Sequence, residues 1–330
     1  MAEWLHEAGI GEERAILVER GEIIAARVDW GETLRPGFIG PAQIVVKHKG
    51  TRRGIARFTD DGEALVDGLD PAITEGATLL LRVTRAAIAE KGRTKLPQAR
   101  PAPPESLPSP APGLLAELRV GPLPVRSLPI TDRSFDEAGW HELVEQAQGG
   151  EIAFPGGSLL VSPTPAMTLI DIDGTLPPPL LARAAVPAIA RALTRLDIGG
   201  SIGIDFPTLA DRKDRLAVDA ALTEALAGWK GERTAMNGFG FVQLVARLER
   251  PSLVARFARY RTGAALRALL RQAERVLDPG VLLLTAAPTL RRAMPAEWEA
   301  ELVRRTGRIV RWQEDAGLAL DGGFAQAVAA

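Results

Sequence analysis

The stretch MTLIDIDGTLPPPLLARAAVPAIARALTRLDIGGSIGIDF, residues 167–206, decides the fold of this chain. Short apolar runs at residues 167–173 and 201–207 flank a long segment, residues 180–196, in which apolar side chains recur at helical spacing. The same alternation continues through residues 211–248. Apolar strands that alternate with helices of about 15 residues predict an α/β layered domain.

Two of the predicted strands end in aspartate. Asp171 and Asp173 close the first, and Asp205 closes the second. Functional side chains of α/β sheets gather at the carboxyl ends of strands, and residues two apart on a strand face the same side. If the strands are neighbours, three carboxylates meet in apolar surroundings, where they must be protonated or hold a cation. Oxygen ligands without nearby His or Cys select a hard ion such as Mg²⁺. The structural alternative is that these carboxylates cap helices or pair with Arg212 or Arg215.

A β-rich region precedes this segment. Residues 36–86 contain four or five short runs of strand-forming residues separated by turns such as Lys49-Gly50 and Glu75-Gly76, which predicts a small barrel of the OB type over residues 36–96. Such barrels commonly bind single-stranded nucleic acid. Candidate contacts are the basic residues of one turn: Lys47, Lys49, Arg52 and Arg53. Phe58 is a candidate for base stacking, although core packing is the commoner role of a phenylalanine.

Composition excludes several classes of protein. Among 330 residues there are no cysteines and three histidines, which excludes disulfides, thiolate zinc sites and cysteine nucleophiles. The acidic, polar N-terminus does not resemble a signal peptide. The chain also lacks an apolar stretch of about 18 residues. We therefore expect a soluble, cytoplasmic protein without membrane contact.

The charge is small overall but unevenly distributed. The formal net charge is -1, yet residues 41–58 carry five basic side chains and no acid, and residues 244–275 carry eight arginines against two glutamates. Local basic clusters on a neutral protein suggest surfaces directed at a polyanion. The alternative is that each cluster is an ordinary solvated face.

One short motif suggests a phosphatase. Residues 171–176, DIDGTL, resemble the opening motif of the haloacid-dehalogenase phosphatases, in which the first aspartate is the nucleophile and the second the acid/base. That family also needs a later acidic pair, and no Asp-Asp or Gly-Asp dipeptide follows Asp173. The motif lies at mid-chain, whereas it usually opens the phosphatase domain.

A longer set of motifs resembles the catalytic region of the RNase E/G endoribonucleases. The segments IAFPGGSLLVSPTPAMTLIDID, ALTRLDIGGSIGIDF, RKDRLAVDAALTEAL, FGFVQL and RPSL match that family in order and spacing, most specifically from Asp197 to Phe206. The resemblance implies that Asp171 and Asp205 hold a catalytic Mg²⁺. It places the family's orienting asparagine at Asp173, which would act as a third ligand or orienter. It also implies that a basic pair, Arg212 and Lys213, contacts phosphate, and that metal-activated water leaves 5′-phosphate and 3′-hydroxyl ends.

The chain departs from that family in three places. The arginine of the family's SRFG motif falls on Gly238, because the sequence here is NGFG. The cysteine motif that links two copies through zinc is absent, which excludes a structural zinc but leaves a homodimer of another kind open. Residues 113–150 are too few to hold the family's sensor of 5′-monophosphate ends, so we expect indifference to 5′ phosphorylation.

Together these observations predict an α/β protein with an inserted OB-like barrel, an RNase H-like/DNase I-like catalytic region and a small α/β C-terminal domain. The expected segments are an N-terminal β-hairpin packing on the catalytic core (1–35), the RNA-binding barrel (36–96), a proline-rich linker (97–112), a reduced RNase H-like region (113–163), the DNase I-like domain (164–260) and the C-terminal domain (261–330). The expected function is Mg²⁺-dependent cleavage of single-stranded RNA. A non-catalytic RNA-binding relative is the first alternative, and the phosphatase is the second.

Overall fold

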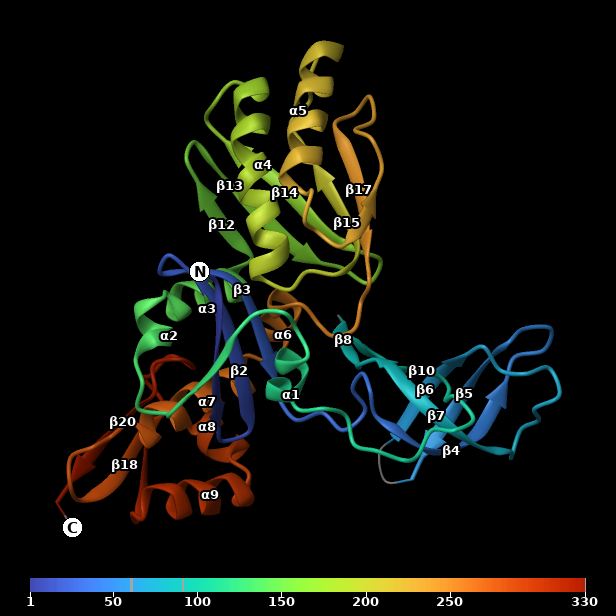
Figure 1. Ribbon diagram of the computed structural model, residues 1–330. Helices are drawn as coiled ribbons and strands as arrows, with labels where there is room; N and C mark the ends of the chain where they lie inside the picture. The colour runs from blue at the N-terminus through green and yellow to red at the C-terminus, as the bar shows by residue number, and fades with distance from the viewer. Residues whose placement is uncertain (60–61, 91, 330) are drawn as a thin grey trace. The chain divides into compact units, whose positions relative to one another are not determined.

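The computed structural model describes residues 1–59, 62–90 and 92–329. It shows a mixed α/β protein with a closed barrel of five strands and several mixed sheets (Figure 1). The chain forms two compact units, one built from Met1–Gly31, Leu114–Val144 and Phe257–Ala330, the other from Glu32–Gly113 and Glu145–Arg256. Within the described ranges, no helix is both long enough and apolar enough to cross a bilayer.

The sheet predicted from the central stretch is present in the second unit. Its six strands lie in the order β12-β13-β14-β15-β17-β16. Their bounds are β12 Glu151–Phe154, β13 Gly157–Pro163, β14 Thr168–Gly174, β15 Gly200–Asp205, β16 Gly231–Arg233 and β17 Phe241–Ala246. Strands β14 and β15 run parallel, and the other neighbours are antiparallel. The helices are α4 Pro178–Arg195 and α5 Arg212–Ala225, so the predicted strand–helix alternation is confirmed.

Only one face of this sheet is apolar throughout. Helices α4 and α5 lie on the same side of it (Figure 1). The buried apolar side chains of the three central strands are Ile170, Ile172, Ile202, Ile204, Val242 and Leu244. The alternate positions of β14 and β17, including Asp171 and Gln243, are exposed. Because strand side chains alternate between faces, Asp171, Asp173 and Asp205, which follow or precede buried isoleucines, reach solvent, whereas Gly203 between Ile202 and Ile204 is buried.

The barrel also belongs to the second unit. Its strands follow one another in the order β10-β6-β5-β4-β7. Their bounds are β4 Ile39–Lys47, β5 Arg53–Phe58, β6 Gly62–Asp67, β7 Thr78–Arg85 and β10 Gln98–Pro101, and a small hairpin joins β8 Ile88–Glu90 to β9 Arg93–Lys95. Small and branched side chains such as Ala56, Ala64 and Val66 fill its interior.

The predicted linker, residues 97–112, begins too early. Gln98–Pro101 is the fifth strand of the barrel. It pairs with β6 and β7, and Ala99 is buried in the core. Pro97 supplies a carbonyl to the amide of Leu65 at 2.9 Å. Prolines at the ends of a strand leave the intervening amides free to pair, so a proline-rich composition did not prevent pairing here.

The first unit holds two further sheets. Their orders are β11-β1-β2-β3 and β19-β18-β20. The strand bounds are β1 Glu3–Gly9, β2 Glu12–Glu19, β3 Glu22–Asp29, β11 Val125–Leu128, β18 Val281–Ala286, β19 Val310–Glu314 and β20 Phe324–Val328. The remaining helices are α1 Leu114–Arg119, α2 Ser134–Glu137, α3 Trp140–Gly149, α6 Leu253–Arg259, α7 Arg261–Glu274, α8 Pro288–Ala293 and α9 Ala296–Thr306.

Buried ion pairs hold the first unit together. Glu7 of β1 is fully buried and accepts a hydrogen bond from Arg14 Nε at 3.0 Å. Arg271 of α7 donates to the same carboxylate and, at 2.6 Å, to Glu12. Arg275 reaches the second oxygen of Glu7 at 3.2 Å. Such pairs must satisfy one another, because an unpaired buried charge is costly.

These contacts correct the interpretation of residues 244–275 as a basic surface. Two of the arginines in this stretch belong to the buried network just described. Arg256 is buried and pairs with Glu32. Arg267 lies over the rings of Trp30 and Trp298, at 4.3 and 4.6 Å from their centroids. Half of the eight arginines therefore serve packing rather than solvent-facing charge.

Candidate metal and RNA site

Asp171 and Asp205 are direct partners across the parallel pair β14–β15. Adjacent strands lie about 4.8 Å apart, and partners in register point to the same face of a sheet. Both aspartates are exposed, whereas Ile170, Ile172 and Ile204 beside them are buried against the helices. The two carboxylates therefore extend side by side from the uncovered face, Asp205 as the last residue of β15 and Asp171 within β14, which continues to Gly174.

The surroundings of these carboxylates differ from the prediction. The sequence suggested burial among apolar residues, but Asp171, Asp173 and Asp205 are all exposed. Asp171 Oδ1 accepts the amide of Ile172 at 3.0 Å. Within the described ranges, the side chains of Asp173 and Asp205 have no hydrogen-bond or ion-pair partner. The argument for a cation is therefore the proximity of two negative charges, which an ion between them would relieve.

Asp173 lies beyond the paired region of β15. Its register partner is Ser158 of β13, and the last pair between β14 and β15 is Asp171 with Asp205. In the part of the chain that the structure describes, no group of three or more acidic or histidine residues is arranged to hold a metal. The site is consequently a pair of carboxylates. That donor set fits Mg²⁺, which commonly binds through one or two carboxylates, several waters and substrate phosphate oxygens.

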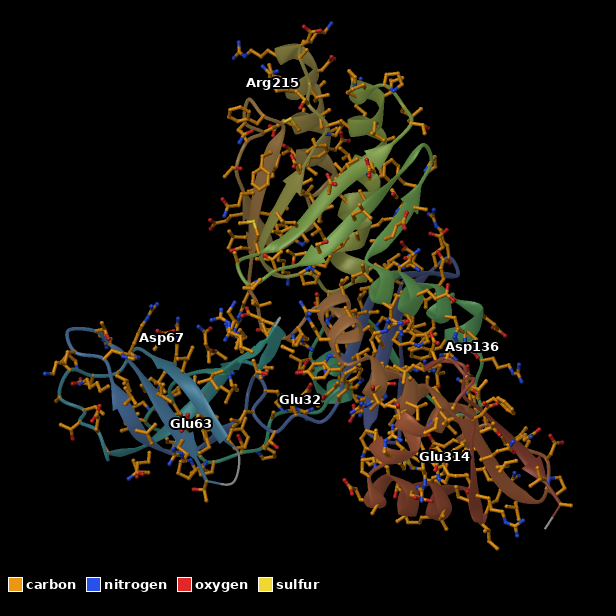
Figure 2. The ribbon with its side chains drawn as sticks, turned by 180° about the vertical axis from the view of Figure 1, so that it is seen from behind. Glu32, Glu63, Asp67, Asp136, Arg215 and Glu314 are labelled. Carbon is orange, nitrogen blue, oxygen red and sulfur yellow. The ribbon has the colours of Figure 1, made fainter. Side chains whose placement is uncertain are left out.

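Within the residues that the structure describes, neither Arg212 nor Arg215 pairs with the aspartates, which was the structural alternative to a metal site. Arg215, labelled in Figure 2, donates from Nη1 to the backbone oxygens of Leu209 and Ala210. It thus stabilises the loop that follows β15. Arg212 and Lys213 are exposed in the first turn of α5, and neither has a hydrogen bond or ion pair among the described residues. Their charges stay available to an anion near the carboxyl end of β15.

The basic turn of the barrel keeps part of its predicted charge. Lys47 Nζ donates to the carbonyls of Pro71 at 2.6 Å and Asp70 at 3.2 Å. Arg52 Nε donates to the carbonyl of Leu69 at 3.0 Å. These partners are backbone carbonyls, so neither side chain has an acidic group paired with it in the described ranges.

The other two members of the turn differ from each other. Arg53 Nε pairs with Asp67 at 2.7 Å, and this ion pair cancels its charge. Lys49 is exposed and has no hydrogen-bond or ion-pair partner in the described parts of the chain. The net result is three cations, Lys47, Lys49 and Arg52, around one turn.

Phe58 cannot be a stacking residue. Only 2% of it is exposed, and it belongs to the core of the barrel. Its ring lies edge-on to that of Phe38, with centroids 5.7 Å apart. The last residue of β5 points inward because the strand alternates, and that face could not be assigned from the sequence.

Sequence reasoning missed an exposed aromatic ring closer to the aspartates. Phe239 lies in the loop before β17, inside the NGFG segment. One indication of this exposure was present in the sequence, because Phe239 lies between two glycines directly before a strand. Such a position provides no neighbouring side chains to bury the ring.

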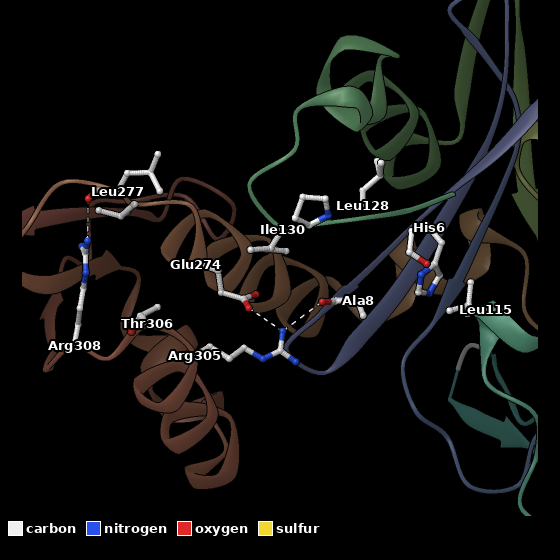
Figure 3. A pocket seen from close by; sticks show the side chains of 13 residues that line it. His6, Ala8, Leu115, Leu128, Ile130, Glu274, Leu277, Arg305, Thr306 and Arg308 are labelled. Atoms are coloured by element: carbon white, nitrogen blue, oxygen red, sulfur yellow. Dashed lines mark hydrogen bonds and ion pairs between the residues drawn. The ribbon is translucent and has the colours of Figure 1, made fainter. Parts of the chain in front are cut away.

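A pocket of about 680 Å³ lies within the first unit (Figure 3). One wall carries an ion pair between Arg305 and Glu274 at 2.8 Å, and Arg305 also reaches the backbone oxygen of Ala8. Burial raises the pKa of Glu274 despite this pairing. Most of the remaining lining is apolar, including Leu128 and Ile130. The sequence did not indicate this pocket, whose residues come from segments far apart in the chain.

Comparison with known proteins adds no assignment: no family model matches the chain, and no curated protein matches it. The function is therefore argued from the aspartate pair and the cationic and aromatic groups described above.

Proposed function

We propose that this protein is a Mg²⁺-dependent endoribonuclease that acts on single-stranded RNA. The observation that carries the proposal is the register of Asp171 and Asp205 on neighbouring parallel strands, with both carboxylates exposed on one face. The proposal extends to the architecture: an OB-like barrel, a DNase I-like sheet, a reduced RNase H-like region and a small α/β C-terminal domain, as in the RNase E/G family.

Each group has a distinct role in this proposal. Asp171 and Asp205 hold the ion, and Asp173 orients it or its substrate. When bound, Mg²⁺ supplies an activated water and offsets charge on the phosphodiester. Arg212 and Lys213 bind backbone phosphate by charge. The cations of the barrel turn raise the affinity for RNA without selecting a sequence, because phosphate contacts carry no sequence information.

The first alternative is RNA binding without cleavage. Two observations favour it. Gly238 stands where the RNase E/G family has the arginine of its SRFG motif, and the described residues provide two carboxylates for the ion rather than three. Retention of both aspartates in register favours the enzyme. The second alternative is a phosphatase, which would require a lysine side chain close to Asp171. In the described ranges no lysine contacts Asp171.

Single-turnover cleavage of a labelled, A/U-rich single-stranded RNA tests the proposal. The proteins are the wild type, Asp171→Asn, Asp205→Asn and, as a charge-matched control, Glu224→Gln on the exposed side of α5. We expect internal cuts that require Mg²⁺, leave 5′-phosphate ends and slow by on the order of 100-fold or more in either aspartate variant. The control should cut at the wild-type rate. If all four proteins bind RNA equally and none cuts it, the non-catalytic alternative replaces this proposal.

A further inference from the structure

Phe239 is the most exposed aromatic residue among the large hydrophobic side chains at the surface. Its exposed fraction is 83%, against 44% for Tyr260 and 41% for Phe324. Burying a phenylalanine ring stabilises the folded state, and this ring, being exposed, contributes almost none of that stabilisation. An exposed ring of this kind is available for a ligand.

The loop that carries this ring has a fixed backbone. Asn237 Oδ1 accepts the amides of Phe239 at 2.9 Å and Phe241 at 3.0 Å. The backbone of Asn237 accepts the amide of Gly240 at 3.2 Å and donates to the carbonyl of Phe241 at 3.0 Å. Gly240 has φ of +88°, and a Cβ there would meet the carbonyl oxygen of Phe206 at 2.9 Å. The exposure of Phe239 therefore results from a loop that is tied closed on both sides of it.

The same contacts place the loop beside the aspartate pair. Phe241, the first residue of β17, is the register partner of Asp205. The amide of Phe206, the residue after Asp205, donates to the carbonyl of Gly240 at 3.3 Å. The loop thus leaves the sheet at the edge where β15 ends, and the chain after β15 leads to the free cations Arg212 and Lys213.

An aromatic face at the sheet edge that carries Asp205, on the side of the chain that leads to two cations, matches the chemistry of a single-stranded nucleic acid. Bases stack on exposed rings, and the backbone is attracted by nearby positive charge. Stacking uses the face of the ring, and every base has such a face, so stacking does not distinguish one base from another. In a protein-docking surface, by contrast, an anchor ring is usually surrounded by other apolar side chains, whereas the neighbours of Phe239 in the loop are two glycines and an asparagine.

We propose that Phe239 forms a stacking subsite for one nucleobase of single-stranded RNA, at the sheet edge where Asp205 lies and where the Mg²⁺ of the proposed function would bind the adjacent phosphate. The subsite accepts any base. This inference rests on the proposed function and adds to it a residue that positions the strand. One stacked base corresponds to about 5- to 100-fold in affinity.

The test uses three variants of the full chain. Phe239→Leu keeps an apolar side chain and removes the aromatic face, and Phe239→Trp restores an aromatic face. Leu216→Ala, at a position 57% exposed on α5, controls for the loss of apolar surface. Affinity and single-turnover rates are measured on an RNA of fixed length and on a series in which one abasic nucleotide moves along the strand. In parallel, 2-aminopurine is placed at each position, because its fluorescence falls when it stacks.

We expect Phe239→Leu to weaken binding of intact RNA about 5- to 100-fold, and Phe239→Trp to restore it. At one position of the abasic series, the wild type and Phe239→Leu should bind equally, and 2-aminopurine at that position should be quenched only by proteins with an aromatic residue 239. If Phe239→Leu behaves as Leu216→Ala on every RNA while the wild type cuts, the inference fails and the nuclease stands. If the base-dependent effect of Phe239 occurs without cleavage, the subsite stands and the nuclease fails. If the wild type neither binds nor cuts RNA, both fail.

Discussion

Glu12 is a buried carboxylate that is kept ionised by neighbouring arginines. Its carboxylate pairs with Arg271 and accepts a hydrogen bond from Trp30 Nε1 at 2.7 Å. Burial opposes ionisation, but the charges of Arg271 and Arg14 outweigh it, so the pKa of Glu12 lies below its ordinary value of 4.5. Between that lowered pKa and 4.5 the unfolded chain binds more protons than the folded chain, and the free energy of unfolding falls as pH falls.

Replacing Glu12 tests this network. Glu12→Gln leaves the buried cations incompletely paired, which should lower the free energy of unfolding by about 3 to 5 kcal/mol at neutral pH. It should also reduce the loss of stability on acidification below the ordinary pKa. Urea unfolding at neutral and acidic pH measures both effects. Glu19→Gln, at the exposed end of the same strand, should change stability by less than about 0.5 kcal/mol. Equal stability of the two variants would contradict the buried pairing.

Phe58 and Phe239 have opposite expected behaviour. Phe58→Ala removes a ring from the barrel core and should cost about 3 to 5 kcal/mol of stability. Phe239→Ala should leave the midpoint of thermal unfolding almost unchanged, because that ring is exposed. Thermal unfolding followed by circular dichroism compares them. A stable Phe58→Ala protein would show that this residue is not in the core.

At the scale of elements, the loop between Gly238 and Phe241 offers a matched pair of glycines. Gly240 has positive φ and faces the carbonyl of Phe206, whereas a Cβ on Gly238 would meet nothing within 4 Å. Gly240→Ala should therefore cost about 1 to 3 kcal/mol through backbone strain, and Gly238→Ala should cost little. Denaturant unfolding of the two variants measures the difference. Similar costs at both positions would argue against the loop geometry described above.

The elements also show what the sequence determines. Strands β14 and β15 and helices α4 and α5 follow from strong apolar periodicity, whereas the pairing of β14 with β15 was a condition of the predicted site, which the structure meets. By contrast, residues 114–119 form the short helix α1, in which Leu114 and Leu118 are buried one turn apart. Helices α2 and α3 are separated at Gly139, whose φ is +91°. Short segments carry too few apolar positions to separate a period of two from one of 3.6.

On the scale of the whole molecule, segments distant in the sequence combine in ways that composition does not reveal. Strand β1 pairs in parallel with β11, so Trp4 lies opposite Val125. The first unit therefore joins the N-terminal strands to the C-terminal segment. The packing of residues 1–35 on the catalytic core stays a prediction. The exposure of the aspartates could not be predicted either, because it depends on which face of the sheet the helices cover.

The small net charge predicts moderate, salt-dependent RNA binding. Because many arginines are paired internally, only the free cations should release counterions, each contributing about -0.7 to the slope of log affinity against log salt for a single strand. Lys49→Gln should reduce the magnitude of that slope by about this amount while leaving stability unchanged. Arg53→Gln should change the slope less, since Arg53 is already paired with Asp67. Titration of RNA at several salt concentrations gives the slopes, and an unchanged slope in Lys49→Gln would remove the barrel turn from the RNA surface.

The most direct measurement locates the ion on the protein itself. Fe²⁺ substituted for Mg²⁺ generates hydroxyl radicals in the presence of ascorbate and peroxide, and these cut the polypeptide next to the bound ion. We predict cuts close to residues 171 and 205 that disappear with excess Mg²⁺ and in Asp205→Asn. Cuts elsewhere in the chain, or the same cuts in Asp205→Asn, would show that the two aspartates do not form the metal site.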